Sequence, residues 1–346
     1  MESERILGQN HILRHFENAI RMGKISHAYI INGEEGSGKM NLAIHFAKAL
    51  QCERNNSNKA INEDGERITV PGTACGQCKS CKQTDSKNQP DIKYITYEKS
   101  GIGVDEIREQ INDDIDIKPY SSPYKIYIVP ESEKMTVQAQ NALLKTIEEP
   151  PEYAIIILLT TNADTFLQTI LSRCVMLNIR PVKEDIIKNQ LTSQYGVGDY
   201  EARVAATFSN GNPGKAIKLA TSEEFKKLKQ YVVGMFMSLE KGGMDIIGEA
   251  IKKTGTFKKQ IDEYFSLMRI WFRDILVYKA TKEEDQIIFQ DEYMTIEKMS
   301  QTYSFDDIND ILKAIDLAES RIKSNVNFDS TIEILLLSIK EKTSGK

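Results

Sequence analysis

The sequence predicts an α/β domain with a parallel sheet, followed by a region built of helices. Up to about residue 180, segments with strand character alternate with segments of helical periodicity. The run at residues 154–161 is apolar in the manner of a strand that is buried on both faces of a parallel sheet. After Pro181 the strand signal disappears. Repeated β–α units of this kind imply a parallel sheet covered by helices.

The expected strands are short and rich in β-branched and aromatic residues. They are residues 27–31, 92–97, 125–129, 154–161 and 175–177. The first of them runs directly into a glycine-rich loop, so a loop of this composition would lie at the carboxyl end of a strand.

Helices are expected between these strands. Apolar residues recur at helical spacing over residues 42–50 and 104–115. A further helix is expected over residues 135–149, where Pro150 stops it. Residues 53–73 are polar and rich in Asn, Glu and Gly. They indicate a loop or an insertion, whose role the sequence does not reveal.

The second half of the chain is expected to be helical. Short helices are expected over residues 182–222, around the stretch Ser209–Gly214, and long amphipathic helices follow. The long helices are expected near residues 257–279, 305–322 and 329–340. We therefore divide the chain into an α/β domain at 1–180, a small helical domain at 181–222 and an all-α C-terminal domain at 223–346.

Composition limits the classes of function. The 346 residues carry a net charge of −5, so any contact with nucleic acid would use a local patch or a larger assembly. The polar N-terminus resembles no signal peptide, and no apolar run approaches the length of a membrane span. Five cysteines, an odd number, argue against a disulfide framework. We expect a cytoplasmic protein with no membrane partner.

The glycine-rich loop resembles a phosphate-binding loop with one position changed. Gly33, Gly36, Gly38 and Lys39 suit the pattern G-x-x-x-x-G-K-[ST], but the last position is Met40. Backbone N–H groups and a helix N-terminus would face the phosphates, and the lysine would reach the β- and γ-phosphates. The hydroxyl that would hold Mg²⁺ is absent, and a thioether is a poor ligand for a hard cation.

A second part of a nucleotide site is altered as well. An acidic pair is expected at the end of a neighbouring strand, here within residues 126–131. Pro130 stands where an aspartate would bind the metal, whereas Glu131 stands where a carboxylate would activate water. Two losses in one function favour weak or absent ATP binding without hydrolysis. The alternative that the stretch is an unrelated glycine turn stays open.

Three clustered cysteines predict a metal site. Cys75, Cys78 and Cys81 follow the spacing C-x2-C-x2-C, and Cys52 is the candidate for a fourth ligand. Four thiolates bind Zn²⁺ tetrahedrally in closed, structural sites, so no catalytic role follows. We expect a zinc module at about residues 52–82. Free thiols in a loop and an iron–sulfur cluster are the alternatives.

Several motifs in one order point to a known family. They are Leu7–Gln9, Ser26–Tyr29, the glycine loop, the inserted cysteine cluster, the stretch NALLKTIEEPP at Asn141–Pro151, and Ser172-Arg-Cys174. This combination resembles the bacterial clamp-loader ATPase family, part of the AAA+ group. The resemblance covers residues 5–220 by motif, and the helical C-terminus by length and class alone. It implies that the sheet domain is an AAA+ P-loop domain, that residues 181–222 form a lid, and that residues 223–346 form a collar.

Within that family, the resemblance is closer to one branch. The motor subunits, gamma/tau, carry an intact loop and an Asp-Glu pair, whereas the delta-prime branch has the zinc module and a degraded nucleotide site. This sequence departs from the motor pattern at Met40 and Pro130. It is therefore more similar to the delta-prime branch, which implies no ATP hydrolysis of its own within the DNA polymerase III holoenzyme.

The resemblance also implies partners and site residues. The partners would be the other clamp-loader subunits (gamma/tau and delta), the sliding clamp and primer-template DNA. Arg173 would act in trans as an arginine finger on the γ-phosphate held by a neighbouring subunit. Lys215 would stand at the second sensor position, and Thr161 or Asn162 at the first. The three residues Ser-Arg-Cys alone would instead favour a pair of Arg173 with a local carboxylate.

Other classes of function stay open. The first alternative is an active gamma/tau-like ATPase with an unusual loop. A P-loop kinase or an unrelated nucleotide-binding protein is a third class, but it would not explain the cysteine spacing. We find no paired metal-binding carboxylates for nucleotidyl transfer, and the sequence does not identify residues that contact DNA.

Overall fold

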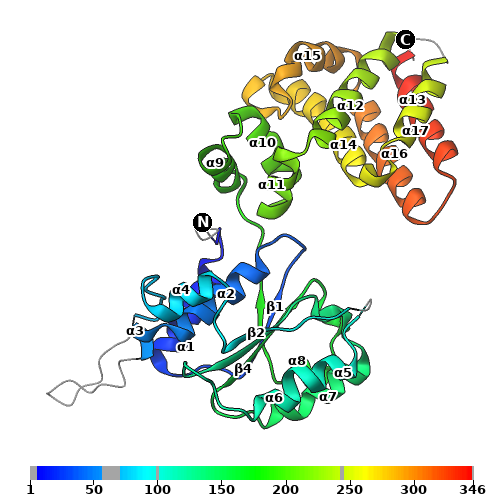
Figure 1. The fold of residues 1–346 in the computed structure, drawn as a ribbon. Helices are drawn as coiled ribbons and strands as arrows, with labels where there is room; N and C mark the ends of the chain where they lie inside the picture. The colour runs from blue at the N-terminus through cyan, green and yellow to red at the C-terminus, as the bar shows by residue number, and fades with distance from the viewer. Residues whose placement is uncertain (1–5, 57–70, 99–100, 242–244, 345–346) are drawn as a thin grey trace. The chain divides into compact units, whose positions relative to one another are not determined.

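The computed structural model describes residues 6–56, 71–98, 101–241 and 245–344. The chain forms two compact units (Figure 1). Unit 1 comprises residues 1–187 together with residues 210–215, and unit 2 comprises residues 188–209 and 216–346. Our division at residues 180 and 222 stays a prediction. Within the described residues, no helix has the length and apolar character needed to span a bilayer.

Unit 1 contains a parallel sheet of five strands. In chain order they are β1 (Ala28–Asn32), β2 (Ile92–Tyr94), β3 (Lys125–Val129), β4 (Ala154–Thr160) and β5 (Val175–Asn178). Their order across the sheet is β2-β3-β4-β1-β5. All seven residues of β4 are buried, as the apolar run predicts for a strand near the middle of the sheet. The predicted α/β class with a parallel sheet is confirmed.

Helices cover both faces of this sheet (Figure 1). They are α1 (Asn10–Met22), α2 (Lys39–Gln51), α3 (Glu53–Asn56), α4 (Lys79–Asp85), α5 (Val104–Ile107), α6 (Asp113–Ile115), α7 (Val137–Glu148) and α8 (Gln168–Leu171). Successive residues of β1 point to opposite faces, so Tyr29 and Ile31 pack with α1 and α2, while Ala28 and Ile30 pack with α5 to α7. The sheet therefore separates two hydrophobic cores.

Two helix boundaries in unit 1 differ from the prediction. The helix expected at 135–149 begins at Val137, because Thr136 caps it by accepting a hydrogen bond from Ala139 N. The helical face over 104–115 includes a π-helix at Arg108–Asn112 between α5 and α6. Sequence periodicity does not distinguish such a widened turn from a regular helix.

The rest of the chain is helical. Its helices are α9 (Glu184–Tyr195), α10 (Asp199–Phe208), α11 (Pro213–Thr221), α12 (Glu223–Lys241), α13 (Asp245–Gly255), α14 (Ile261–Thr281), α15 (Tyr293–Thr302), α16 (Phe305–Lys323) and α17 (Phe328–Ser344). Trp271 on α14 is fully buried and stacks on Phe236 with ring centroids 5.6 Å apart. The helix expected from residue 257 begins at Ile261, after a short 3₁₀ turn at Lys258–Gln260.

Candidate nucleotide, arginine and metal sites

The glycine loop joins β1 to α2 in the order that a phosphate loop requires. Gly36 and Gly38 have positive φ angles of 79° and 92°, which favour glycine, and Lys39 begins α2. Gly33 N–H donates to Thr160 O on the neighbouring strand β4 at 3.1 Å. The loop therefore lies at the carboxyl ends of β1 and β4, where ligands of open α/β sheets bind.

Lys39 is bonded to the loop itself. Its Nζ donates to the carbonyl oxygens of Gly33 at 2.6 Å and of Glu34 at 2.8 Å. Burial lowers the pKa of Lys39, and the nearby carboxylates of Glu133, Glu35, Glu131 and Glu34 oppose that shift. The ammonium group thus stabilises the loop from inside.

Met40, the first position at which the loop departs from the motif, packs against the core. Met40 is partly buried and contacts the hydrophobic cluster on the α1 and α2 face of the sheet. A hydroxyl at this position would hold Mg²⁺ in an active phosphate loop, whereas the methionine contributes apolar packing. At this position the chain therefore has a side chain that packs against the core and offers no hydroxyl.

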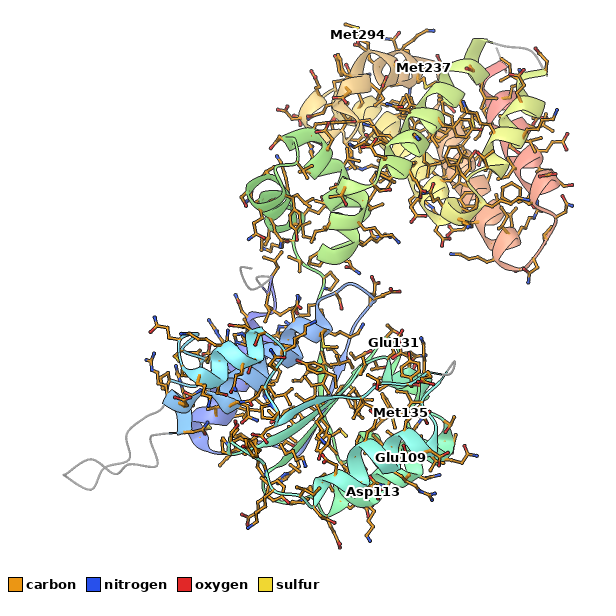
Figure 2. All side chains as sticks on the ribbon, in the orientation of Figure 1. Glu109, Asp113, Glu131, Met135, Met237 and Met294 are labelled. Carbon is orange, nitrogen blue, oxygen red and sulfur yellow. The ribbon has the colours of Figure 1, made fainter. Side chains whose placement is uncertain are left out.

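Pro130 and Glu131, where the motif predicts an acidic pair, directly follow β3. Glu131 adopts a left-handed φ of 46° directly after Pro130. Its carboxylate accepts hydrogen bonds from Tyr97 Oη and from Lys134 Nζ, the latter at 2.9 Å. Figure 2 labels Glu131 and Met135 at the two ends of the turn that contains this ion pair. The hydrogen bonds from Tyr97 and Lys134 lower the pKa of Glu131. Both carboxylate oxygens are engaged, so the group is poorly placed to accept a proton from water.

Glu133 is a residue of this site that our sequence analysis missed. Its carboxylate accepts hydrogen bonds from Thr161 N at 3.2 Å and from Thr161 Oγ1 at 2.8 Å. Thr161 follows β4 and is one of the two candidates for the first sensor. Asn162, the other, accepts a bond from Asp164 N at 3.0 Å and caps a 3₁₀ turn. The signal was a second carboxylate two residues after Glu131.

A cavity of about 270 Å³ lies beside the loop. Its lining includes Gly33, Ser37 and Thr161, together with Asn178, Arg180 and residues 210–213. The Oδ1 atom of Asn32, another lining residue, is buried without a hydrogen-bond partner among the described residues. The cavity is slightly smaller than typical ligand pockets, which measure about 300–1,000 Å³.

Lys215 lies near the loop through its backbone. Its N–H donates to Asn212 Oδ1 at 3.1 Å in the first turn of α11. A Cβ atom added to Gly36 would lie 3.5 Å from Lys215 N. The structure thus brings Gly33, Gly36, Gly38, Lys39 and the backbone of Lys215 together.

Arg173 occupies the turn between α8 and β5 and pairs with a local carboxylate. Its guanidinium contacts Glu148 Oε1 at 3.0 Å and donates to Thr169 O at 3.0 Å. The side chains of Arg173 and Glu148 are 40% and 44% exposed, so the ion pair is a surface pair worth little to stability. Burial raises the pKa of the adjacent Cys174 thiol to about 12.

The four predicted cysteines come together at the far end of α2. Cys52 caps the C-terminus of that helix, and Cys75, Cys78 and Cys81 surround it from the following loop and α4. Their sulfur atoms all lie within 4.8 Å of one another. With Zn–S bonds of about 2.3 Å, tetrahedral geometry places sulfur atoms about 3.8 Å apart. The cluster could therefore hold a metal ion.

Backbone N–H groups point at these sulfur atoms. Cys75 N donates to Cys52 Sγ at 3.3 Å, and Cys78 N donates to Cys75 Sγ at 3.3 Å. Bonds from Gln77 N and Cys78 N lower the pKa of Cys75 to about 6, whereas burial raises the pKa of Cys52. Gly76 supplies the positive φ of 71° that the tight turn needs. Most of the polar segment at 53–73 lies outside the described residues.

Comparison with known families and proteins gives this geometry a context. The family model described as "DNA polymerase III, delta subunit" matches residues 8–183, and "DNA polymerase III, delta subunit, C terminal" matches residues 248–341. DNA polymerase III subunit delta' of Bacillus subtilis is 26% identical over 337 residues, 96% of each chain. Subunit tau of the same organism is 30% identical over 302 residues, 80% of this chain and 50% of tau. A solved DNA polymerase III gamma subunit-related protein of Thermotoga maritima aligns over 96% of this chain at 20% identity, with a TM-score of 0.40.

Proposed function

This chain belongs to the DNA polymerase III delta-subunit family, and on that premise we propose that it is a delta-prime-like subunit of the clamp loader. Membership supports a clamp-loader role within DNA polymerase III. In our proposal the chain helps to load the sliding clamp on primed DNA, together with gamma/tau and delta subunits. The similarity to a delta' subunit over 96% of both chains supports this assignment.

The subunit does not hydrolyse ATP in this proposal. One observation carries that conclusion: both metal-holding positions are occupied by residues with another role. Met40 packs in the core, and Pro130 offers no carboxylate. Glu131 is paired with Lys134, so the group that would activate water is engaged too. Binding of ATP at Gly33, Gly36, Gly38 and Lys39 is weak or absent.

Arg173 serves the site of a neighbour in this proposal. A guanidinium stays charged at physiological pH and forks onto phosphate oxygens, as a trans arginine finger requires. The exposed pair with Glu148 is weak enough to exchange for a phosphate. Ser172 supports the side chain, since Arg173 donates to its Oγ at 3.1 Å.

The cysteine cluster binds Zn²⁺ in this proposal. All four ligands would be protein thiolates, which leaves no open position for catalysis. The ion would tie the end of α2 to α4 and the loop before it. Such thiols stay reduced in the cytoplasm, where a replication subunit would act.

The test is ATP turnover by the reconstituted clamp loader in the presence of clamp and primed DNA. Arg173→Ala in this chain is expected to lower turnover about 10³-fold per affected site while the complex still assembles. Glu148→Gln is the matched control, because it removes the local partner of Arg173 and keeps the arginine. Unchanged turnover with Arg173→Ala would contradict the finger assignment.

The alternative is an active gamma/tau-like ATPase, which the 30% identity to tau favours. The two functions separate in the isolated chain. If the isolated wild-type chain hydrolyses ATP without the clamp and Lys39→Ala abolishes this activity, the ATPase is favoured. If the wild-type chain and the Lys39→Ala variant both show only background hydrolysis, the delta-prime-like role is supported.

A further inference from the structure

Residues 212–214 are bonded to the glycine loop. Asn212 Nδ2 donates to Glu35 O at 2.7 Å and lies 3.4 Å from Glu34 Oε2. Gly214 N donates to Gly36 O at 3.1 Å. Asn212 is only 5% exposed. These contacts form a clasp, by which we mean the bonds from Asn212 and Gly214 to residues 34–36.

The clasp and Lys39 together engage the carbonyl oxygens of the loop. Lys39 Nζ donates to the carbonyl oxygens of Gly33 and Glu34, Asn212 donates to that of Glu35, and Gly214 to that of Gly36. Four consecutive carbonyl oxygens therefore accept hydrogen bonds from the protein itself. These bonds stabilise this conformation of the loop without a ligand.

Close packing makes the clasp specific. A Cβ atom added to Gly214 would lie 2.5 Å from Gly36 O, so glycine alone allows this approach. Gly211 has a φ of 82°, and its carbonyl accepts a bond from Val182 N at 2.8 Å. The segment is thereby fixed on both sides, at the loop and at the chain that follows β5.

The course of the chain adds a second observation. Residues 210–215 pack with unit 1, although the chain on either side of them belongs to unit 2. Residues 210–213 also line the cavity beside the loop, as Gly33 and Ser37 do. For Lys39 to reach a phosphate in that cavity, its ammonium group would have to leave the carbonyl oxygens of Gly33 and Glu34.

We propose that the clasp is an autoinhibitory contact, in which Asn212 and Gly214 hold the glycine loop in the conformation where Lys39 bonds to loop carbonyl oxygens, so that nucleotide binding must break these bonds. The inference rests on the part of the proposed function that treats this loop as an altered nucleotide site. It adds that weak binding comes from this held conformation of the loop as well as from the residues at Met40 and Pro130.

The experiment separates the donor of Asn212 from its role as a helix cap. Asn212→Ser keeps a capping oxygen for α11 but removes the amide donor to Glu35 and Glu34. Asn327→Ser is the matched control, because Asn327 caps α17 by accepting a bond from Ser330 N at 3.0 Å. Binding of fluorescent ADP to the full chain, without Mg²⁺, is measured for wild type and both variants.

We expect Asn212→Ser to lower the dissociation constant about three- to tenfold, and Asn327→Ser to leave it unchanged. The gain should vanish when Lys39→Ala is added. Equal affinity of wild type and Asn212→Ser for ADP, including undetectable binding by both, would contradict the autoinhibitory role of the clasp.

Hydrogen exchange of the wild-type chain supplies a test that needs no variant. Saturating ADP should accelerate exchange of the Gly214 amide, because its bond to Gly36 O opens when the loop takes up phosphate. Slower or unchanged exchange with ADP bound would overturn the inference. Assembly with the other clamp-loader subunits tests the proposed function separately, since it depends on neither result.

Discussion

The two ends of α2 carry two candidate sites that differ in how many of their predicted groups are present. At its N-terminus, the glycine loop joins a strand to a helix as a phosphate loop does, but Met40 packs against the core and Lys39 bonds to loop carbonyls. At its C-terminus, Cys52 lies with three further thiols within 4.8 Å of one another. The first site has the backbone course of a phosphate loop without the hydroxyl and the aspartate of the motif, whereas the second brings all four predicted cysteines together.

The difference indicates which side chains at each site contribute to the stability of the fold. In our proposal a neighbouring subunit hydrolyses ATP, so the positions of this loop that would hold a metal are free to carry other residues. A structural metal contributes folding free energy, so the loss of a ligand costs stability directly.

Removal of one thiol should have the largest effect. Cys81→Ser deletes a buried ligand, and we expect the chain to lose bound zinc and about 3 kcal/mol or more of stability. Metal content and thermal unfolding are measured together. Cys174→Ser is the matched control, because this cysteine lies outside the cluster. An unchanged melting temperature after loss of the metal would contradict a stabilising role for the metal at the C-terminal end of α2.

Acid should release the metal before it affects the loop. Protons compete with zinc for thiolates, and burial raises the pKa values of Cys52 and Cys81, so affinity should fall steadily as the pH is lowered. A chelator titration between pH 8 and pH 5 measures this, with roughly one or more protons released per ion bound. Affinity that does not change over this range would argue against thiolate ligands.

Lys39→Ala should have an intermediate effect. It removes two hydrogen bonds to the loop carbonyls, so we expect a loss of about 1–2 kcal/mol in the free energy of unfolding. Denaturant unfolding of the isolated chain measures it. No destabilisation would mean that the lysine is free for a ligand, and the two ends of α2 would then be more alike.

Met40→Thr should restore a hydroxyl without restoring hydrolysis. Pro130 still offers no carboxylate, and the lost packing should cost about 1–2 kcal/mol. ATP turnover of the single variant and of Met40→Thr combined with Pro130→Asp is compared with wild type. ATP turnover above background in the single variant would show that Met40 alone prevents hydrolysis at the loop.

Glu131→Gln should have the smallest effect. The pKa of Glu131 is lowered in the folded chain, so its stabilising contribution is present above the ordinary glutamate pKa and is lost as the pH falls through the lowered value. The side chain is 54% exposed, which limits the effect to about 0.5 kcal/mol. Unfolding at pH 7 and pH 3 tests it, and a larger loss at pH 3 than at pH 7 would contradict the sign.

The strands and the cysteine cluster could be predicted because their signals are local. The apolar run of β4 and the C-x2-C-x2-C spacing each occur within a few residues. The pairing of Glu133 with Thr161 joins residues 28 positions apart, and the clasp joins Asn212 to Glu35 across 177. Periodicity and motif spacing carry no information on such contacts, which depend on tertiary packing.

The same limit applies to Arg173. The motif Ser172–Cys174 suggested a function for Arg173, but the local partner of Arg173 is Glu148 on α7. The sequence allowed a carboxylate partner without identifying it, and the structure supplies the residue.

The most direct test of the account is ATP turnover by the reconstituted clamp loader that carries Lys39→Ala in this chain alone. If the loop is structural, turnover with clamp and primed DNA should stay at the wild-type rate, while Arg173→Ala lowers it sharply. A sharp loss with Lys39→Ala in a complex that assembles normally would contradict the account, because the loop of this subunit would then take part in catalysis.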